Sequence, residues 1–426
     1  MRFILLITGL LSLQTLRSQE DIKVLTYNLM LYRSTIGQCD YSNNDPAQKE
    51  DNLKTVIQYA DPDVVVFQEI GNSQGNILDL LDNSLNTDGE TKYTYTTYAG
   101  SSSLINHCFF NENKIGYIGH NSIERGINNE YIVRLIDAYR FYYKDPSLAS
   151  GADTTYFTVF AAHFKAGQGG QNPDDRHVAA EAIMEYVRDN DLQNFMLAGD
   201  LNVYAASEPA YQQLTDFYDA SYNFNDPTGI EGAWNNNNSG NFSLVHTQST
   251  HTGFDPCFSG GGMDDRFDFI LLSNSIMDNS NYLEYDSYSY RVIGQDGNRF
   301  NSSVVSPSNA DVSLNVANAL YRVSDHLPVV VTLKAHSRDP SSTQELKFNK
   351  HFIKIQNPVR NKALTIRSSY NRQTTATLYD LTGRKIQDIN ITPGVNNIHL
   401  DSKTKKGNYI LKINKKGVTP FRIVII

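Results

Sequence analysis

The sequence predicts an α/β domain followed by a small all-β domain. Residues 21–69 and 156–200 each read as a buried strand, a helix and a second buried strand. From Leu346 the pattern changes to short alternating segments, with turn residues every ten to thirteen positions over about 80 residues. This spacing is typical of a small β-sandwich.

The distribution of charge separates the same two parts. The 426-residue chain has a formal net charge of −9, but residues 21–340 hold 19 basic and 41 acidic residues, whereas residues 341–426 hold 16 basic and four acidic ones. Such a jump indicates a domain boundary near residue 340. Because an acidic domain repels phosphates, a nucleic-acid substrate would require divalent cations or a local basic patch.

The N-terminus resembles a secretion signal. Arg2 is followed by an apolar run from Phe3 to Leu13 and then by Arg17-Ser18-Gln19, so we predict a signal peptide cut near Ser18. The alternative is a short buried helix. After this segment no run of 18 apolar residues follows, so we expect an exported chain without a membrane span.

Three cysteines, Cys39, Cys108 and Cys257, allow at most one internal disulfide, and the sequence leaves the pair open. Their wide spacing matches no metal-binding motif. The fold is therefore expected to depend mainly on its apolar core.

In the first strand–helix–strand unit, each strand is followed by a polar residue. The strand over residues 21–27 leads to Asn28, and the strand over residues 63–68 leads to Glu69. Between them Asp45 and Pro46 predict a helix start, and Pro62 follows the helix. An acid in this position is usually a solvated strand end, so Glu69 alone would be a weak functional signal.

The second unit repeats this arrangement. We predict a short helix over residues 77–85 and several strands over residues 93–143, before a strand over 156–162 that leads to His163. A helix opens at Asn172-Pro173, and a strand over 195–198 is followed by Gly199 and Asp200. Asp200 and Asn202 would point the same way if the chain stays extended, and the alternative is a turn or helix cap.

Three later stretches complete the domain. Residues 228–262 are rich in Gly, Asn and Ser and predict a long surface loop. Residues 266–272 read as a strand in which Asp268 lies among apolar neighbours, and a buried carboxylate needs a partner. Asp325 and His326 form a turn before the last strand of this domain, and residues 337–344 read as a polar linker.

Taken in order, these segments resemble the endonuclease/exonuclease/phosphatase family, which includes deoxyribonuclease I. The resemblance spans roughly residues 21–334 and rests on six short motifs in the order of the family. They are Thr26-Tyr27-Asn28, Phe67-Gln68-Glu69, Ala162-His163-Phe164, Gly199-Asp200-Leu201-Asn202, Arg266-Phe267-Asp268-Phe269-Ile270 and Ser324-Asp325-His326.

This resemblance implies a four-layer α/β sandwich, in which two packed β-sheets are flanked by helices. It also implies a metal-dependent phosphoric ester hydrolase that uses Mg²⁺, or Mn²⁺ in its place. Glu69 is the expected metal carboxylate, with Asn28 and Asp325 beside it. Mg²⁺ takes one or two protein carboxylates and keeps several waters, which suits this set.

The same resemblance assigns the catalytic residues. His326 would pair with Asp268, Asp200 would orient or deprotonate the attacking water with the help of Asn202, and His163 would donate to the phosphate or act as an acid. Which group is the general base stays open. Each residue also has a structural alternative, such as a strand-entry cap for Asp325 or a core histidine for His163.

The tail resembles the C-terminal sorting domain of the type IX secretion system. The matching pieces are Ile355-Gln356-Asn357-Pro358, Leu378-Tyr379-Asp380-Leu381-Thr382-Gly383-Arg384, Gly407-Asn408-Tyr409-Ile410-Leu411 and the closing run Phe421 to Ile426. Ile426 departs from the terminal basic residue common in such domains. The alternative is a carbohydrate-binding or adhesive β-module.

Together these observations predict a signal peptide over 1–18, a catalytic domain over 19–336, a linker over 337–345 and a sorting domain over 346–426. We expect a monomer that interacts with the type IX secretion machinery and is secreted or held at the cell surface. Its expected activity is that of an endonuclease that hydrolyses DNA or RNA. The alternatives are a sphingomyelinase-like phospholipid phosphodiesterase, a phosphatase, or an inactive binding protein on the same scaffold.

Overall fold

The computed structural model describes the large domain over residues 19–100 and 102–338. In the tail it describes residues 353–355, 359–360, 362–368, 374–392, 394–401, 404–414 and 420–425. The predicted signal peptide and most of the predicted linker lie outside these residues.

The first sheet of the large domain has the strand order β11-β13-β1-β2-β4-β3, with β12 paired to β13. β1 and β2 run parallel, with Val24 opposite Val64, and α1 connects them. Their carboxyl ends therefore lie at the same edge of the sheet. The elements are β1 (Gln19–Tyr32), α1 (Pro46–Ala60), β2 (Val64–Gly71), β3 (Tyr93–Tyr95), β4 (Leu104–Asn111), β11 (Leu283–Tyr285), β12 (Arg291–Val292) and β13 (Val329–His336).

The second sheet has the order β5-β6-β7-β8-β10-β9. It contains a second parallel pair, β7 and β8, in which His163 is opposite Asp200, and α3 connects the two strands. β10 runs antiparallel to β8 and places Asp268 opposite Asp200. The elements are β5 (Ile115–Arg125), β6 (Tyr131–Tyr143), β7 (Tyr156–His163), α3 (Asn172–Asp189), β8 (Phe195–Asp200), β9 (Phe224–Asn225) and β10 (Asp268–Ser273).

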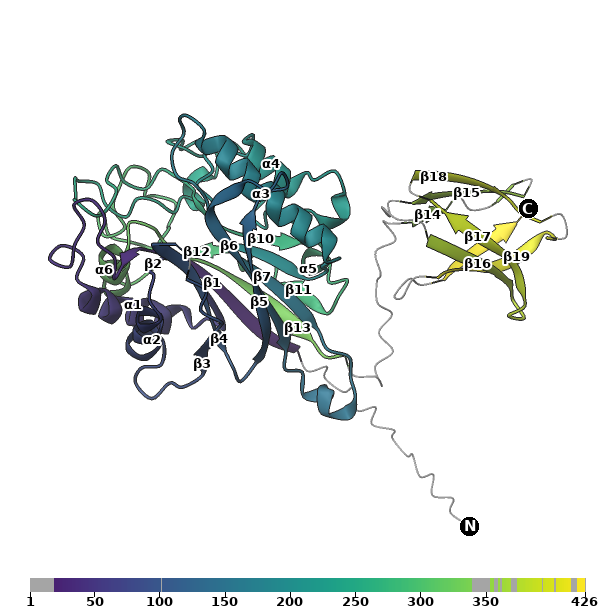
Figure 1. Cartoon of the computed structure of the whole chain (residues 1–426), viewed down its shortest axis with the longest axis horizontal. Helices are drawn as coiled ribbons and strands as arrows, with labels where there is room; N and C mark the ends of the chain where they lie inside the picture. The colour runs from purple at the N-terminus through teal and green to yellow at the C-terminus, as the bar shows by residue number, and fades with distance from the viewer. Residues whose placement is uncertain are drawn as a thin grey trace, which may run out of the picture.

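The two sheets pack face to face, and helices cover their outer faces (Figure 1). Successive side chains of β7 point to opposite faces of the second sheet. Val159 belongs to a core shared with β1, whereas Phe160 belongs to a second core with α3 and α4 (Pro209–Thr215). On the other side, α1 and α6 (Leu314–Val323) contribute to the core of the first sheet. This arrangement confirms the predicted four-layer sandwich.

The predicted helices form at the predicted places. The Asp45 side chain accepts a hydrogen bond from the Ala47 backbone, and α1 ends at Asp61 in a left-handed conformation before Pro62. The segment predicted as one short helix over 77–85 is α2 (Gln74–Leu80), followed by a short π-helix over Leu81–Leu85. The sequence analysis did not single out α4, α5 (Asn274–Met277) or α6.

A disulfide joins Cys39 to Cys257, and Cys108 is buried as a free thiol. The bridge connects the loop after β1 to the loop before β10, across 218 residues of sequence. β1 and β10, which these loops adjoin, carry the predicted site residues Asn28 and Asp268. The bridge therefore restrains two loops near these residues.

The tail forms two antiparallel sheets, ordered β14-β15-β18 and β17-β16-β19-β20. They share one apolar core that includes Leu364, Leu378 and Leu411. This confirms the small all-β sandwich. The strands are β14 (Ile353–Ile355), β15 (Ala363–Ser368), β16 (Thr374–Asp380), β17 (Lys385–Ile391), β18 (Gly394–His399), β19 (Gly407–Ile413) and β20 (Phe421–Ile425).

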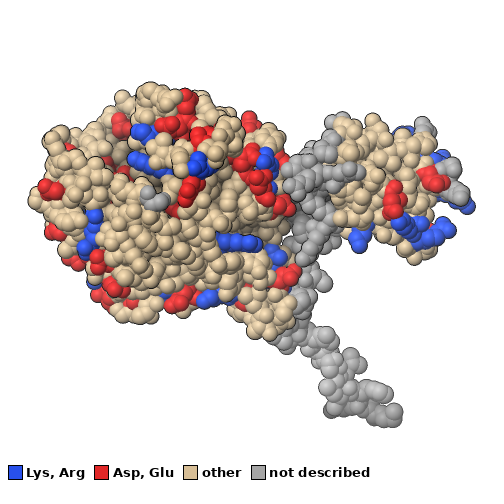
Figure 2. Space-filling model, in the orientation of Figure 1, with Lys and Arg blue, Asp and Glu red and all other residues tan. Residues whose placement is uncertain are grey.

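Acidic and basic side chains are interspersed on the face of the large domain that Figure 2 shows, and no continuous basic surface covers it. In the part of the chain that the structure describes, no helix is both long and apolar enough to cross a membrane.

Candidate active site

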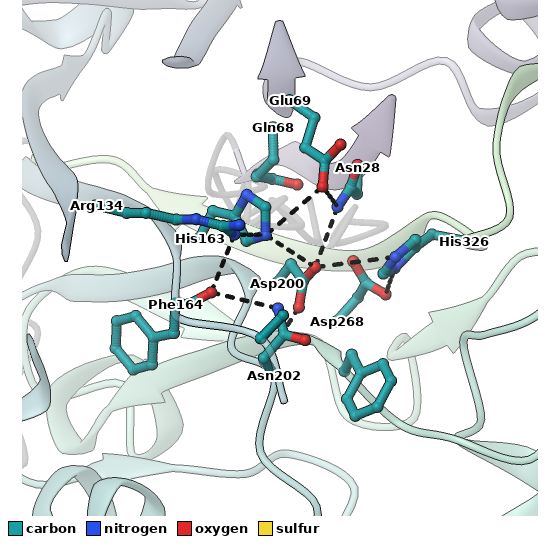
Figure 3. Close-up of polar contacts among 12 residues, drawn as sticks. Asn28, Gln68, Glu69, Arg134, His163, Phe164, Asp200, Asn202, Asp268 and His326 are labelled. Atoms are coloured by element: carbon teal, nitrogen blue, oxygen red, sulfur yellow. Dashed lines mark hydrogen bonds and ion pairs between the residues drawn. The ribbon is translucent and has the colours of Figure 1, made fainter. Parts of the chain in front are cut away.

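The two parallel strand pairs bring the predicted residues together between the sheets. Asn28 and Glu69 come from β1 and β2, and His163 and Asp200 are the last residues of β7 and β8 (Figure 3). Because each pair runs parallel, its two carboxyl ends meet at one edge, and the packed sheets place both edges side by side.

A bulge directs Glu69 into the site. The pairing of β1 with β2 shifts register between Asn28 and Tyr32, and Glu69 itself has a φ of 59°. A bulge commonly re-aims a side chain next to a functional site. Here Glu69 Oε2 accepts a hydrogen bond from Leu31 N at 3.1 Å, and Oε1 lies 3.3 Å from Asn28 Nδ2.

Gly199 lets the second sheet present Asp200. A Cβ at Gly199 would lie 1.9 Å from the Ala162 carbonyl oxygen of the neighbouring strand, far inside van der Waals contact. Only glycine therefore fits at this position of β8 beside β7. The strand ends one residue later, with the Asp200 carboxylate inside the site.

Asp200 is the centre of the polar network. Its Oδ2 accepts from Asn28 Nδ2 at 3.0 Å and lies 3.5 Å from His163 Nε2 and 3.9 Å from His326 Nε2. Burial raises the pKa of Asp200 to about 7, and the charge of Asp268 adds to this, whereas the charge of His326 opposes it. This carboxyl group can therefore exchange a proton near neutral pH.

His326 is held between a carboxylate and an amide. Its Nδ1 lies 2.7 Å from Asp268 Oδ2, and its Nε2 lies 2.8 Å from Gln248 Nε2. Burial lowers the pKa of His326, but the charges of Asp268, Asp200 and Asp325 outweigh burial and hold the pKa well above its usual value. The amide nitrogen at Nε2 favours the neutral ring instead, and a cation bound among the carboxylates would favour it too.

His163 has the opposite electrostatic environment. Arg134 Nη1 contacts its Nε2 and also donates to the Phe164 carbonyl oxygen at 3.1 Å. Burial, together with the charges of Arg134 and His326, lowers the pKa of His163 well below its usual value. This histidine is therefore neutral at physiological pH.

Asn28 and Asn202 act through their amide nitrogens. Asn28 Oδ1 accepts from Met30 N at 2.9 Å, which turns Nδ2 towards Glu69 and Asp200. Asn202 is not extended as expected but lies in the left-handed region with a φ of 49°, because the strand ends at Asp200. Its backbone N–H donates to Asp200 Oδ1 at 3.0 Å, and its Nδ2 donates to Phe164 O at 3.3 Å.

The fourth predicted acid, Asp325, lies on the His326 side. Its Oδ2 accepts from Ser259 N at 2.9 Å and from Gln248 Nε2 at 3.2 Å. Among the described residues no hydrogen bond joins Asp325 to Asn28 or Glu69. The predicted metal set is therefore divided between the two sides of the site.

The donor atoms fit a cation. Asp268 Oδ1 and Asp325 Oδ1 are buried and have no hydrogen-bond partner among the described residues. Ligand atoms of Asp200, Asp268 and His326 also lie within 4.8 Å of one another. Buried carboxylate oxygens without partners are costly, and a divalent cation would satisfy them. This second possible ligand set overlaps residues that the sequence analysis assigned to catalysis.

A recess of about 330 Å³ opens beside Glu69 and His163. Arg134 and Lys165 contribute positive charge to its wall, and Val133 contributes an apolar side chain. The recess is large enough for one compact substituent of a phosphate ester.

Three further residues contribute to the site and were not predicted from the sequence: Lys49, Arg134 and Gln248. Lys49 is buried, and its Nζ donates to the carbonyl oxygens of Leu29 and Met30, both at 2.7 Å. Burial lowers the pKa of Lys49 to about 7, against the charges of Asp325 and Glu69. Its position one helical turn before Leu53, on the apolar stripe of α1, was a signal. Arg134 and Gln248 carry no comparable sequence signal.

Comparison with family models identifies the tail. Residues 357–426 match the model described as a secretion system C-terminal sorting domain. This match lies within the predicted sorting domain and confirms the predicted secretion or cell-surface location. No curated protein matches the chain.

Solved structures similar to the large domain include three of interest. The endonuclease/exonuclease/phosphatase from Bacteroides vulgatus is 16% identical over 74% of this chain and 99% of its own, with a TM-score of 0.46. D. rerio TDP2 complexed with single-strand DNA product is 14% identical over 74% and 98%, with a TM-score of 0.45. The mannosyl-6-phosphatase of Bacteroides thetaiotaomicron is 16% identical over 73% and 99%, with a TM-score of 0.43.

Proposed function

We propose that this chain, with an endonuclease/exonuclease/phosphatase fold and a secretion sorting domain, is an exported metal-dependent phosphodiesterase. The observation that carries the proposal is the position of the buried Asp200 carboxylate between two histidines of opposite electrostatic environment. A phosphoryl group needs both a group that accepts a proton from water and donors for its oxygens. Nucleic acid is the substrate we propose first.

Asp200 is the group suited to take the proton of the attacking water. Its pKa of about 7 matches the pH at which a general base is most effective. Asn28 and the backbone N–H of Asn202 hold its two oxygens, so the carboxylate keeps one orientation. The neutral His163 accepts from Arg134 at Nε2, so its ring hydrogen is on Nδ1, and Nδ1 would be the atom that donates to a phosphoryl oxygen.

His326 is suited to the developing negative charge. Asp268 fixes its Nδ1, and its Nε2 lies 2.8 Å from Gln248 Nε2 and 3.9 Å from Asp200 Oδ2. A carboxylate behind an imidazole orients the ring and stabilises its cationic form. Gln248 Nε2 donates to Nε2 of the neutral ring, so His326 would first take up a proton there, and the resulting cation would donate a hydrogen bond or that proton to the phosphoryl group or the leaving oxygen.

A divalent cation, Mg²⁺ or Mn²⁺, would supply charge neutralisation for the phosphoryl oxygens when bound. Glu69 and Asp325 are the carboxylates that we propose to hold it, with Asn28 orienting Glu69. The alternative set is Asp200, Asp268 and His326. Titration of the chain with Mn²⁺, followed by electron paramagnetic resonance, separates the sets. The first predicts weaker binding in Glu69→Gln, and the second predicts weaker binding in Asp268→Asn.

The function is tested on the purified mature chain with EDTA or with Mg²⁺. Supercoiled plasmid, bis-p-nitrophenyl phosphate and sphingomyelin are incubated in parallel, with Asp200→Asn as the inactive variant and Glu124→Gln, a change of an exposed acid, as the control. Metal-dependent nicking that Asp200→Asn abolishes supports a nuclease. Turnover of sphingomyelin with intact plasmid moves the function to lipid hydrolysis, and no turnover of any ester contradicts the proposal.

A further inference from the structure

Gln248 joins two site residues although it belongs to none of the motifs. It lies in the long loop over residues 228–262, which the sequence predicted only as a surface loop. Its Nε2 is 3.2 Å from Asp325 Oδ2 and 2.8 Å from His326 Nε2. One amide group therefore contacts both neighbouring residues of the Ser324-Asp325-His326 motif.

The backbone holds Gln248 in this position from two sides. Leu327 N donates to Thr247 O at 2.7 Å, and Thr250 N donates to Asp325 O at 2.9 Å. On the other side, Gln248 N donates to Asp265 O at 3.0 Å. The residue is thus clamped between the segment leading into β10 and the segment leading into β13. Its side chain is aimed by backbone pairing and not by a freely moving loop.

The chemistry of the amide fixes the direction of these contacts. An amide nitrogen carries two hydrogens and accepts none, so it can donate one to Asp325 Oδ2 and one to the lone pair of His326 Nε2. The ring hydrogen then lies on Nδ1, where Asp268 Oδ2 is 2.7 Å away. Asp268 and Gln248 therefore select the same tautomer and ring orientation from opposite sides.

We propose that Gln248 is a positioning residue, which keeps the His326 ring and the Asp325 carboxylate in one mutual orientation for attack on the phosphate. This proposal rests on the proposed phosphodiesterase function. Without the amide, Asp325 would keep the Ser259 backbone as a donor, and His326 would keep Asp268, but among the described residues no other side chain hydrogen-bonds to both. Partners of this kind typically change activity by about 10- to 100-fold when removed.

The test compares Gln248→Met with Gln295→Met in the purified mature chain, with bis-p-nitrophenyl phosphate and Mg²⁺. Methionine keeps the length of the side chain and removes the donor. Gln295 is the matched control, because its Nε2 holds the same loop through His246 O at 3.1 Å and touches neither Asp325 nor His326. We expect kcat to fall about 30-fold in Gln248→Met with KM within about twofold, and both constants to stay within about twofold in Gln295→Met.

A kcat within about threefold of wild type in Gln248→Met, or an equal loss in both variants, overturns the proposal. Should Gln248→Met fail to fold, Gln248→Asn replaces it, because its amide is one methylene too short to reach both partners. A second readout is independent of turnover: nitrogen chemical shifts of the His326 ring in selectively labelled protein. We expect one ring state in the wild type and exchange between states in Gln248→Met. If no ester is hydrolysed, the function proposal fails, while an unchanged ring spectrum in Gln248→Met alone refutes the role of Gln248.

Discussion

The two histidines of the site occupy opposite electrostatic environments although they lie on either side of one carboxylate. His326 has Asp268 behind it, and the surrounding carboxylates raise its pKa well above the usual value despite burial. His163 has Arg134 beside it, and burial together with this arginine lowers its pKa well below that value. The same side chain is thus prepared to carry charge on one side and to stay neutral on the other.

This difference assigns separate tasks to chemically identical groups. Pairs of titratable groups whose environments push their pKa values apart are typical of sites that need an acid and a base together. Here the carboxylate-backed ring suits the developing negative charge, and the arginine-backed ring suits hydrogen bonding without a net charge.

The largest expected effect comes from His326→Asn. The substitution removes the ring and its charge but leaves an amide of similar polarity, so kcat for bis-p-nitrophenyl phosphate should fall by about 10³-fold. Steady-state kinetics with Mg²⁺ measures this. His251→Asn is the control, since His251 is another buried histidine, in the loop over residues 228–262, and stacks on Phe258. Equal losses in the two variants would mean that His326 is only structural.

Asp268→Asn should cost less, about 10²-fold in kcat, because the ring remains but its charged partner is lost. The new amide nitrogen at position 268 could also donate to His326 Nδ1, which would move the ring hydrogen to Nε2. The pH profile measures the difference. The charge of Asp268 raises the pKa of Asp200, so while His326 keeps its own charge, neutralising Asp268 should move the acid limb of kcat to lower pH. An acid limb that moves to higher pH would contradict this electrostatic account.

His163→Gln should have a smaller effect, about tenfold in kcat, since the glutamine amide can still donate one hydrogen bond. His163→Leu, which removes the donor, should be about tenfold worse than His163→Gln. Similar rates in the two variants would show that hydrogen bonding by His163 is not needed. The two histidines would then differ in importance as well as in charge.

The effect of metal removal is expected to depend on pH, because the Asp200 carboxyl group shares the Asn28 amide with the proposed ligand Glu69. The folded pKa of Asp200, about 7, lies above the ordinary value of 3.8, so between these pH values the folded chain holds a proton that the unfolded chain releases. The free energy of unfolding therefore decreases as pH rises through this window. Mg²⁺ should raise the Tm of the apo protein by about 5 °C at pH 8 and much less at pH 5. Differential scanning calorimetry of wild type and Asp200→Asn checks this, and an equal Mg²⁺ effect at both pH values would contradict it.

The sequence predicted the site residues whose positions are set by the end of a buried strand. It did not predict those whose positions depend on pairing between strands or loops. Asn28, Glu69, His163 and Asp200 follow buried strands, and parallel pairing brings such ends together whatever the loops do. Arg134 meets His163 only because β6 pairs with β7, a register that the sequence does not encode locally.

The contacts made by the loops were not predicted for the same reason. Gln248 reaches His326 through bridges formed by residues far apart in sequence, and the Cys39–Cys257 disulfide depends on the same arrangement of loops. A pattern within one segment cannot show either contact. Lys49 is different, because a lysine on the apolar stripe of a helix is visible in the sequence and indicates a buried partner.

The smallest expected effect comes from Arg134→Met, which removes the positive charge beside His163. The arginine lowers the pKa of both His163 and Asp200, so its loss should raise both and move the acid limb of kcat up by about half a pH unit. At the pH optimum kcat should stay within about threefold of wild type. Arg140→Met is the control, because Arg140 lies on the same strand but stacks on Tyr156 with its guanidinium carbon 5.1 Å from the ring centroid. The shift is opposite in sign to that expected for Asp268→Asn. If both variants moved the limb in the same direction, the charges beside the two histidines would not be what separates their roles.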